Sequence, residues 1–597
     1  MKAALMHYLN PDLRTVLFAC KGLSAVTLAL AVSMNLDLDK PFWAMVASMM
    51  LQARPEAGLV IEKAACLVLG STVGAAIAIL ILDSLTPYPA VAIGALTLCV
   101  AATSVVASTM RHVNFVFATA LVSVTAILIV LFSMADPINT TSESIFLVVR
   151  ARLGEVLIGA SCATLASVLL YPFKVETLLE GNTHRLQSST LAHIHAILQG
   201  QSTRSVIFQQ RMNIIALATA LNDDANGGRY DRAGNIDAAI LTANKALTII
   251  AWGQTVERIV GNNPKQLPDL LASFVNRFAE GCSPLNHLSP SARLQTLDGC
   301  GPNKEVRDLG QKDALASALI ESLDKVLEAL SAMLGASLPL VEGASVTQRL
   351  PRFMRHRDWL VGIRSAFRNS LVFLGAMGIW ILSDEPASLI MMIVLPVLFS
   401  QMFAASPAPR VVVRKLISGT LIAIPVAIFF VLALLAKGSS DFEALMFVLA
   451  PPLFLGLMAL TSPALTPYGL GFCLTLAVLV QPSNYMTFAV DQGLSTGLGI
   501  VAGLGLLYAG FYLLGPPKST WLQRRIIKGI YSDLKDMRAK GLPADWLNHR
   551  AAERLSYLGA YEPNGPAGRA LTERGLSALE RGHRLKLTLN PRYRNIL

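Results

Sequence analysis

Charged residues are scarce in this sequence. Only 15% of its 597 residues are Asp, Glu, Lys or Arg, whereas a soluble globular protein usually contains about 25%. Hydrophobic residues make up 53% of the chain, and the mean hydropathy is +0.52. The composition is therefore typical of an integral membrane protein and not of a protein with a large soluble core.

Motifs for catalysis and nucleotide binding are also missing. The sequence contains no GxxxxGK[ST] loop for the phosphates of ATP, no HExxH motif and no GxSxG motif. Its seven cysteines include no CxxC or CxxxC pair, so we expect neither disulfides nor a structural zinc. We predict that the protein is not an enzyme, has no cofactor, and would have to use an ion gradient for any active transport.

The net charge of +11 does not indicate a nucleic-acid partner. No basic run is interleaved with aromatic residues, and Lys and Arg collect in the cytoplasmic parts of membrane proteins. Residues 516–597 show this tendency, with 16 Lys and Arg against 7 Asp and Glu. We therefore expect the lipid bilayer, and not a nucleic acid, to be the partner that this charge serves.

Two blocks of the chain are almost free of charge, and each contains apolar runs long enough to be membrane-spanning helices. The N-terminus has only Lys2 and Arg14 around a polar stretch, which predicts a retained first helix and not a cleaved signal peptide. The predicted spans are 15–34, 41–53, 62–82, 88–108, 114–133, 146–171, 364–382, 387–404, 413–436, 444–461, 466–481 and 492–514. The short second span leaves a count of ten or eleven open.

The charges in the loops predict the orientation of these spans. Basic residues alternate with acidic ones from one loop to the next, and Lys and Arg favour the cytoplasmic side. Both termini are therefore expected in the cytoplasm of a bacterium, with the protein crossing the inner (plasma) membrane many times. The predicted domains are an N-terminal transmembrane block (1–172), a cytoplasmic helical domain (173–355), a C-terminal transmembrane block (356–515) and a helical cytoplasmic C-terminal region (516–597).

The two membrane blocks resemble each other at an offset near 350 residues. In both, an Arg, a span, a Pro, a second span and another Pro precede a Lys and a Gly. Six spans per block would give two parallel repeats, which are common in transporters, with the substrate handled near their interface. The predicted fold class is thus an all-α membrane protein of two parallel repeats of about six helices. A duplicated scaffold without transport is the alternative.

The cytoplasmic insert shows apolar positions at helical spacing. We expect helices at 175–198, 205–223, 235–261, 266–280 and 311–334. The stretch 281–310 contains several Pro and Gly residues and is predicted to be a loop.

Ionisable residues inside a span are costly and are functional candidates by default. Arg150, Arg152 and Glu155 open the sixth span. Arg152 and Glu155 are three residues apart and can pair on one helix face. Glu155 could carry a proton and the arginines could bind an anionic substrate; the alternative is a structural ion pair.

Further candidates lie near the ends of spans. Asp491 could take part in proton exchange, although a boundary carboxylate is usually just solvated. Cations near the cytoplasmic ends could attract an anion, or only anchor the topology: Lys63, Arg111 and Lys415. Two small-xxx-small pairs, Gly70 with Gly74 and Gly499 with Gly503, predict close helix packing. The pair Phe42-Trp43 is interpreted as an interfacial anchor.

The order of these motifs resembles the fusaric acid resistance family. The matching segments are Pro41-Phe42-Trp43-Ala44, Pro55, Gly58, Lys63, Gly70 to Gly74, Arg152-x-x-Glu155-x-x-x-Gly159, Tyr171-Pro172, Pro407-x-Pro409-Arg410, Gly419-Thr420 and Met486-Thr487-Phe488 followed by Asp491. The last of these is similar to the region before the final helix of the aromatic carboxylic acid exporters. Ser71 departs from the more common Thr, and the C-terminal region is shorter than in those exporters.

The resemblance implies export of small aromatic carboxylic acids across the inner membrane, driven by the proton gradient. It also implies a periplasmic membrane-fusion or adaptor protein as a partner, and we expect a homo-oligomer, a dimer first of all. Two other functions stay open from the residues alone. The protein could be a membrane scaffold for envelope assembly, or it could be an anion channel.

Overall fold

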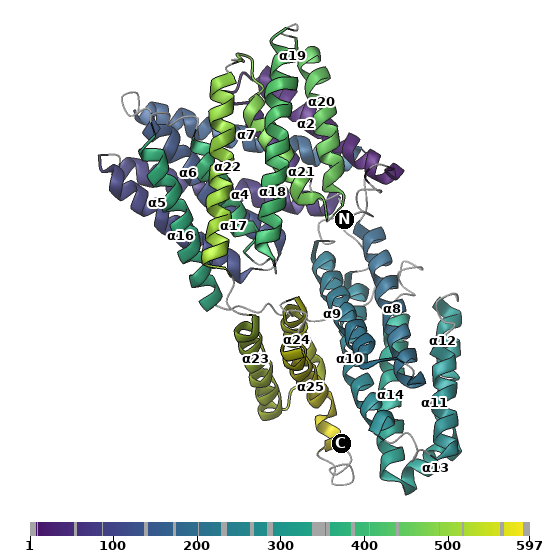
Figure 1. Cartoon of the computed structure of the whole chain (residues 1–597). Coiled ribbons are helices and arrows are strands. Elements are labelled where there is room, and N and C mark those ends of the chain that lie inside the picture. Colours follow the sequence, from purple (N-terminus) through teal and green to yellow (C-terminus); the bar gives the residue numbers. More distant parts are fainter. Residues whose placement is uncertain are drawn as a thin grey trace. The chain divides into compact units, whose positions relative to one another are not determined.

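A computed structural model describes most of the chain (Figure 1). The described residues are 8, 10–52, 57–85, 87–110, 112–135, 141–170, 175–200, 202–227, 236–262, 268–282, 290–336, 353, 359–383, 389–404, 406, 408–437, 441–462, 464–486, 488, 490–515, 519–560 and 566–588. Within these ranges every regular element is a helix and there is no strand. The all-α prediction is confirmed for this part of the chain.

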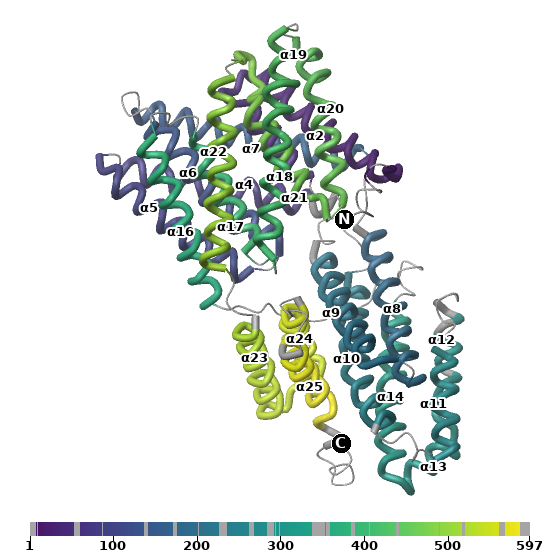
Figure 2. Tube along the Cα trace, viewed as in Figure 1, coloured from purple at the N-terminus to yellow at the C-terminus, as the bar shows by residue number. Residues whose placement is uncertain are grey.

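The chain folds into two compact units, each made of two separate segments. One unit combines Met1–Phe173 with Arg357–Pro516, and the other combines Lys174–His356 with Pro517–Leu597. The colours of Figure 2 show this interleaving, because two separate ranges of the colour bar occur together within each unit. We call the first the apolar unit and the second the polar unit.

The apolar unit contains the helices expected to cross the membrane. Its first segment forms α2 (Leu13–Asn35), α3 (Phe42–Leu51), α4 (Ala57–Leu85), α5 (Pro89–Thr109), α6 (Val113–Ala135) and α7 (Ser142–Leu169). Its second segment forms α16 (Trp359–Ile381), α17 (Ile390–Met402), α18 (Pro409–Pro425), the π-helical segment η4 (Val426–Leu432), α19 (Ala433–Leu435), α20 (Phe442–Leu460), α21 (Thr466–Val480) and α22 (Val490–Leu513).

Seven helical stretches of the described chain are long and apolar enough to cross a membrane. They are Leu13–Asn35, Val60–Leu85, Pro89–Thr109, Val113–Ala135, Pro409–Leu435, Phe442–Leu460 and Val490–Leu513. Three shorter apolar helices, α3, α17 and α21, have 10, 13 and 15 residues. All three are buried along most of their length, so neighbouring helices cover them. The protein is thus a multi-pass membrane protein.

Glycines bring the helix backbones close together in both segments of this unit. A Cβ atom on Gly70 or Gly74 of α4 would lie 2.5 Å from the carbonyl oxygen of Ala118 or Val122 of α6. A Cβ on Gly499 of α22 would lie 2.8 Å from a side-chain carbon of Leu389. The close packing predicted from the small-xxx-small pairs is confirmed, because no side chain fits at these positions without displacement.

Helices of the two segments also pack against one another. Helix α5 packs along α16, α2 packs along α20, and α6 packs along α17. Within the segments, α3 packs on α7 and α17 packs on α22. The short helix α17 therefore lies between helices of both segments, and α3 contacts α21 of the second segment besides its neighbours in the first.

The polar unit is helical as well. The insert forms α8 (Val175–Gln199), α9 (Arg204–Gly227), α10 (Ile236–Asn262), α11 (Asp269–Cys282), α12 (Pro290–Asp298), α13 (Lys304–Lys312) and α14 (Ala314–Gly335). The prediction of a continuous loop over 281–310 is wrong, because α12 and the start of α13 lie within it. Both helices are only nine residues long, and a pattern of that length is hard to separate from a polar loop.

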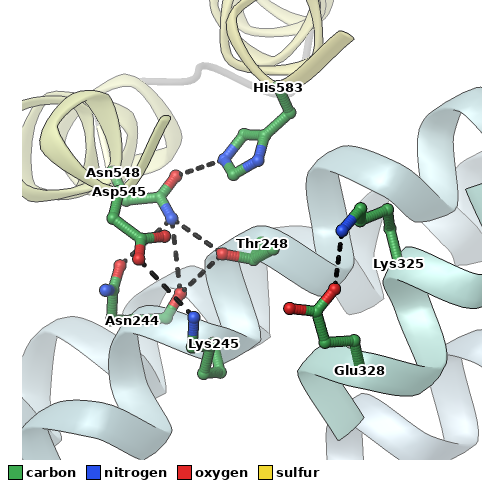
Figure 3. Close-up of polar contacts among 8 residues, drawn as sticks. All are labelled: Asn244, Lys245, Thr248, Lys325, Glu328, Asp545, Asn548 and His583. Carbon is green, nitrogen blue, oxygen red and sulfur yellow. Dashed lines mark hydrogen bonds and ion pairs between the residues drawn. The ribbon is translucent and has the colours of Figure 1, made fainter. Parts of the chain in front are cut away.

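The C-terminal segment forms α23 (Ser519–Lys540), α24 (Ala544–Ala560) and α25 (Pro566–Thr588), and it packs on the insert. Figure 3 shows the polar contacts at this junction. The Asn548 side-chain amide donates to Asn244 Oδ1 (3.0 Å) and Thr248 Oγ1 (2.9 Å), and its oxygen lies 2.7 Å from Nε2 of His583. The Lys245 ammonium lies 3.5 Å from the Asp545 carboxylate. The insert and the C-terminal region thus share one interior.

Candidate functional site

Helix α7 brings two charged side chains into the interior of the apolar unit. Arg152 Nη1 lies 3.6 Å from Glu155 Oε2, and the two side chains are only 11% and 3% exposed. The pair forms because residues three apart lie on the same face of a helix. Arg150 is exposed, so the structure does not bring it to this site. The predicted pairing of Arg152 with Glu155 is confirmed.

Trp43 of α3 lies against this pair. The guanidinium carbon of Arg152 is 4.4 Å from the Trp43 ring centroid, which is the geometry of a cation–π contact. Trp43 and Phe42 are each only 6% exposed. The interpretation of Phe42-Trp43 as an interfacial anchor is therefore wrong: the indole is part of the interior and holds the arginine.

A polar recess lies on one side of Arg152 and Trp43. It is lined by Asp39, Lys40 and Glu155 together with apolar residues of α6 and α7. The Lys40 ammonium is 3.5 Å from the Phe132 ring centroid. Two acidic and two basic groups therefore surround this recess, and Glu155 is the one carboxylate among them that comes from a predicted span.

The same two residues also line an apolar cavity of about 40 Å³. Apart from Trp43 and Arg152, aliphatic residues, Met50 and Phe117 line it. They come from α3, α4, α6, α7, α17 and α21, so both segments of the apolar unit contribute to the wall. A cavity of this size holds a few water molecules and is smaller than an aromatic ring.

Three buried donors at this junction have no acceptor among the described residues. They are Nε1 of Trp43 and Nε and Nη1 of Arg152. The 3.6 Å contact between Nη1 and Glu155 is ionic and is too long for a hydrogen bond. Arg and Trp side chains can only donate hydrogen bonds, and a buried donor without an acceptor is unfavourable. The site is therefore complementary to a group that only accepts, and a carboxylate is the small organic group that fits this best.

Lys63 contacts two residues of the cavity wall. Its ammonium donates to the carbonyl oxygen of Met50 and is 4.9 Å from the Phe117 ring centroid. Met50 and Phe117 both line the apolar cavity. Lys63 thus stands behind the cavity wall and does not line the cavity itself. Arg111 lies outside the described residues.

The remaining sequence candidates are elsewhere. Lys415 of α18 donates to the carbonyl oxygen of Ala464, 3.1 Å away, and lies 5.8 Å from the Tyr468 ring centroid. Asp491 is exposed in the first turn of α22. Neither residue lines the recess or the cavity. No group of three or more His, Cys, Asp or Glu that could hold a metal occurs in the part of the chain that the structure describes.

Sequence reasoning missed Trp43, Asp39 and Lys40 as neighbours of the Arg152–Glu155 pair. The sequence contained a partial signal for Trp43, because it stands in a short apolar span close to a proline. In such a span, however, a tryptophan at the membrane interface and a tryptophan in the core look alike. The aliphatic cavity wall carries no signal, since its residues are the common residues of any membrane helix.

The fold and this site define a class: a multi-pass helical membrane protein with a buried, donor-rich site at the junction of its two halves. The profile of the fusaric acid resistance protein family matches residues 15–588. The chain belongs to this family.

Individual relatives are distant but cover most of the chain. An uncharacterized transporter of Gluconobacter oxydans is 25% identical over 583 residues, covering 89% of this chain and 74% of the relative. The p-hydroxybenzoic acid efflux pump subunit AaeB of Edwardsiella tarda is 23% identical and covers 90% of this chain and 83% of the relative. The subunit of the same name from Escherichia coli is 20% identical over 83% of this chain and 75% of the relative.

Proposed function

We propose that the protein exports small aromatic carboxylates across the bacterial inner membrane. The observation that carries this proposal is the pair of buried donors, Trp43 and Arg152, at the wall of an apolar cavity. A carboxylate would accept hydrogen bonds from the donors, and its ring would lie among the aliphatic side chains. Membership of the family and the efflux-pump names of distant relatives support the same class of substrate.

Export by alternating access would fit the small volume of the cavity. A cavity of about 40 Å³ cannot hold an aromatic ring, so the substrate would bind only after helices around it separate. The wall is shared by both segments of the apolar unit, and a shift of one segment against the other would open it. The described conformation would then be one in which the site is closed.

We propose two parallel repeats of six helices as the moving parts. Matched packing supports this: α5 lies on α16 as α20 lies on α2, and α3 lies on α7 as α17 lies on α22. Close contacts correspond as well. Gly159 of α7 faces the carbonyl of Ala44 in α3, and Gly503 of α22 faces that of Met392 in α17. The charges are not repeated, because α22 contains one charged residue, Asp491 in its first turn, and no basic residue that could pair as Arg152 does with Glu155.

The orientation and the partners belong to the same proposal. Both termini, the domain 173–355 and the region 516–597 would be cytoplasmic, following the distribution of Lys and Arg. The membrane blocks would be 1–172 and 356–515. A periplasmic adaptor protein would continue the path outward, and the transporter would be a homo-oligomer, a dimer first of all.

Flux into proteoliposomes tests the substrate. We expect the purified protein to move p-hydroxybenzoate, and Arg152→Gln to raise the half-saturating concentration by about tenfold or more, because a hydrogen bond to a charged group contributes about 1.5–3 kcal/mol. Arg150→Gln is the matched control, since Arg150 is exposed on the same helix two residues away. Equal half-saturation in both variants would contradict the proposed site.

Glu155 is proposed to carry the coupled proton. We expect Glu155→Gln to transport down a substrate gradient but to lose the acceleration that a proton gradient gives the unchanged protein. Full acceleration in this variant would remove Glu155 from the mechanism. Flux of the unchanged protein that ignores the proton gradient would indicate an anion channel, and no flux even with an adaptor present would indicate a scaffold.

A further inference from the structure

A second buried arginine lies in the apolar unit, away from the cavity. Arg368 of α16 is only 5% exposed. Its Nη2 donates to Ser365 Oγ (3.0 Å), and its Nε donates to Asn369 Oδ1 (3.2 Å). The guanidinium carbon lies 4.2 Å from the Phe511 ring centroid. All of these partners are electrically neutral.

Arg368 has no acidic partner among the described residues. Other buried arginines of this protein are paired: Arg152 lies beside Glu155, and Arg211 of the polar unit beside Glu257. A buried charge without a counter-charge is unfavourable, and an apolar residue of similar size is often as stable or more stable at such a position. In a membrane helix such a residue is a functional candidate by default, and its natural complement is an anion.

Polar side chains lead from Arg368 toward the apolar cavity. Asn369 Nδ2 donates to Ser104 Oγ of α5 at 2.9 Å. The preceding residue, Thr103, accepts a 3.1 Å hydrogen bond from Gln401 Nε2 of α17, and Gln401 Nε2 also donates to Ser123 Oγ of α6 at 2.9 Å. These contacts join four helices that are otherwise apolar in this region.

The far end of this polar path lies close along the chain to residues of the cavity wall. Gln401 follows the cavity residue Leu398 by three positions, so both lie on one face of α17. Ser123 directly precedes Val124, which also lines the cavity. The path therefore ends at Gln401, whose Nε2 donates to Thr103 and Ser123, one turn of α17 from the cavity wall.

We propose that Arg368 forms a second anion-binding site, which receives a small carboxylate before or after it occupies the Trp43–Arg152 cavity. This inference rests on the proposed function, because it uses the same substrate class. Arg364, one turn earlier on α16, is exposed. An anion at the surface of the unit would therefore meet Arg364 first, then Arg368, and then the hydroxyl and amide groups that lead to the cavity.

Ligand-dependent thermal stability tests the second site without any transport measurement. We expect benzoate to raise the melting temperature of the full-length protein in detergent. Arg152→Met should keep part of this rise, and the double variant Arg152→Met with Arg368→Met should lose it. Complete loss in Arg152→Met alone would overturn the second site, as would a double variant that melts like Arg152→Met at every benzoate concentration.

Flux separates the second site from a structural role. We expect Arg368→Met to be at least as thermostable as the unchanged protein without benzoate, yet to need at least five times more p-hydroxybenzoate for half-maximal flux. Arg368→Lys should restore part of the loss, and Arg150→Gln, at an exposed position of α7 that is not on the proposed path, should stay within twofold of the unchanged protein. An unaltered half-saturation in a stable Arg368→Met would overturn the inference.

The two proposals can fail separately. If the unchanged protein moves no aromatic acid, the proposed function fails, and the benzoate-dependent melting temperatures still decide the existence of the second site. If flux is present and depends on Arg152 but not on Arg368, the proposed function stands and the inference falls.

Discussion

At the scale of single residues, Trp43 and Arg152 act as one group. The indole face stabilises the guanidinium cation, while both side chains keep donors free for an acceptor. Glu155 offsets the guanidinium charge from the next turn of α7. An arginine held in this way can stay in an apolar interior and still exchange a weak partner for a better one.

The indole N–H can be tested separately from the ring. Trp43→Phe keeps an aromatic face over Arg152 but removes the free donor Nε1. We expect the half-saturating p-hydroxybenzoate concentration in proteoliposomes to rise by about tenfold, since a hydrogen bond to a charged group contributes about 1.5–3 kcal/mol. Trp359→Phe, at the exposed start of α16, is the control. A Trp43→Phe protein that matches this control would show that the indole only supports the arginine.

His583 makes the stability of the polar unit depend on pH. Burial lowers the pKa of His583 to about 4, and the nearby Asp545 opposes this only in part. In the unfolded chain the pKa is about 6.5, so protons bind preferentially to the unfolded state. The free energy of unfolding should therefore fall as the pH drops from about 6.5 toward 4, by about 1.4 kcal/mol per pH unit for one such histidine.

Hydrogen exchange of α10 in the full-length protein measures this effect, after correction for the intrinsic pH dependence of exchange. His583→Gln should reduce the loss of protection between pH 6.5 and 5, because the amide can still donate to Asn548 without titrating. Burial also lowers the pKa of His193, to about 3. In the His583→Gln protein this histidine therefore keeps part of the pH dependence of stability. The exposed His184 provides the control His184→Gln. Equal slopes in the two variants would exclude His583 as the titrating group.

At the scale of helices, much of the fold was predictable from the sequence. Apolar runs bounded by Pro, Gly and charge predicted α2 to α7 and α16 to α22 within a few residues, because a membrane helix must satisfy its backbone internally and cover its length with apolar side chains. The helices α12 and α13 were missed, since nine residues span fewer than three turns and show no clear period.

The residues that surround the predicted site were harder to predict from the sequence. Spacing along α7 was enough to pair Arg152 with Glu155, because that contact is local. The contacts of Arg152 with Trp43, and of Arg368 with Phe511, join helices far apart in the sequence. These contacts depend on tertiary packing alone, because the periodicity of apolar residues does not indicate which helices are neighbours.

The glycine contacts give a prediction for the helices. Gly74→Ala would place a methyl group 2.5 Å from the Val122 carbonyl oxygen and 2.9 Å from Thr125 Cβ. We expect separation of α4 from α6 and a loss of about 1–3 kcal/mol in stability, which is typical of overpacking. Gly94→Ala on α5 is the matched control, because no atom lies within 4 Å of its added Cβ.

Thermal unfolding of the two variants in detergent, followed by size-exclusion chromatography, measures the difference. The control should be as stable as the unchanged protein or slightly more stable, since alanine favours a helix over glycine by up to about 1 kcal/mol. If Gly74→Ala retained the melting temperature of Gly94→Ala, the close approach of α4 and α6 would not limit stability.

At the scale of the whole molecule, the polar unit constrains the path of the chain. The insert and the C-terminal region share a buried interior, in which Asn548 bonds to Asn244 and Thr248, and Thr255 donates to Glu580 at 3.2 Å. Two segments that share an interior must lie on the same side of a membrane. The chain between residues 356 and 517 must therefore cross the membrane an even number of times.

The proposed six crossings, by α16, α17, α18 with its continuation, α20, α21 and α22, would satisfy this condition, and the short helices α17 and α21 would then be spans. A membrane-impermeant maleimide can test the count. Cysteines placed at the exposed positions Ser205 of α9 and Arg574 of α25 should both react in inside-out vesicles and stay unlabelled in spheroplasts. A cysteine at the exposed Asp441, before α20, should show the opposite pattern.

The unchanged protein, which has seven cysteines of its own, gives the background for this labelling. Labelling of Ser205→Cys and Arg574→Cys from opposite sides would mean that the insert and the C-terminal region cannot form one unit in the membrane. Labelling of both from the outside would keep the unit but reverse the orientation, and the anion would then reach Arg368 from the periplasm. The side from which these two cysteines react thus decides the direction in which the proposed path through Arg368 and the cavity operates.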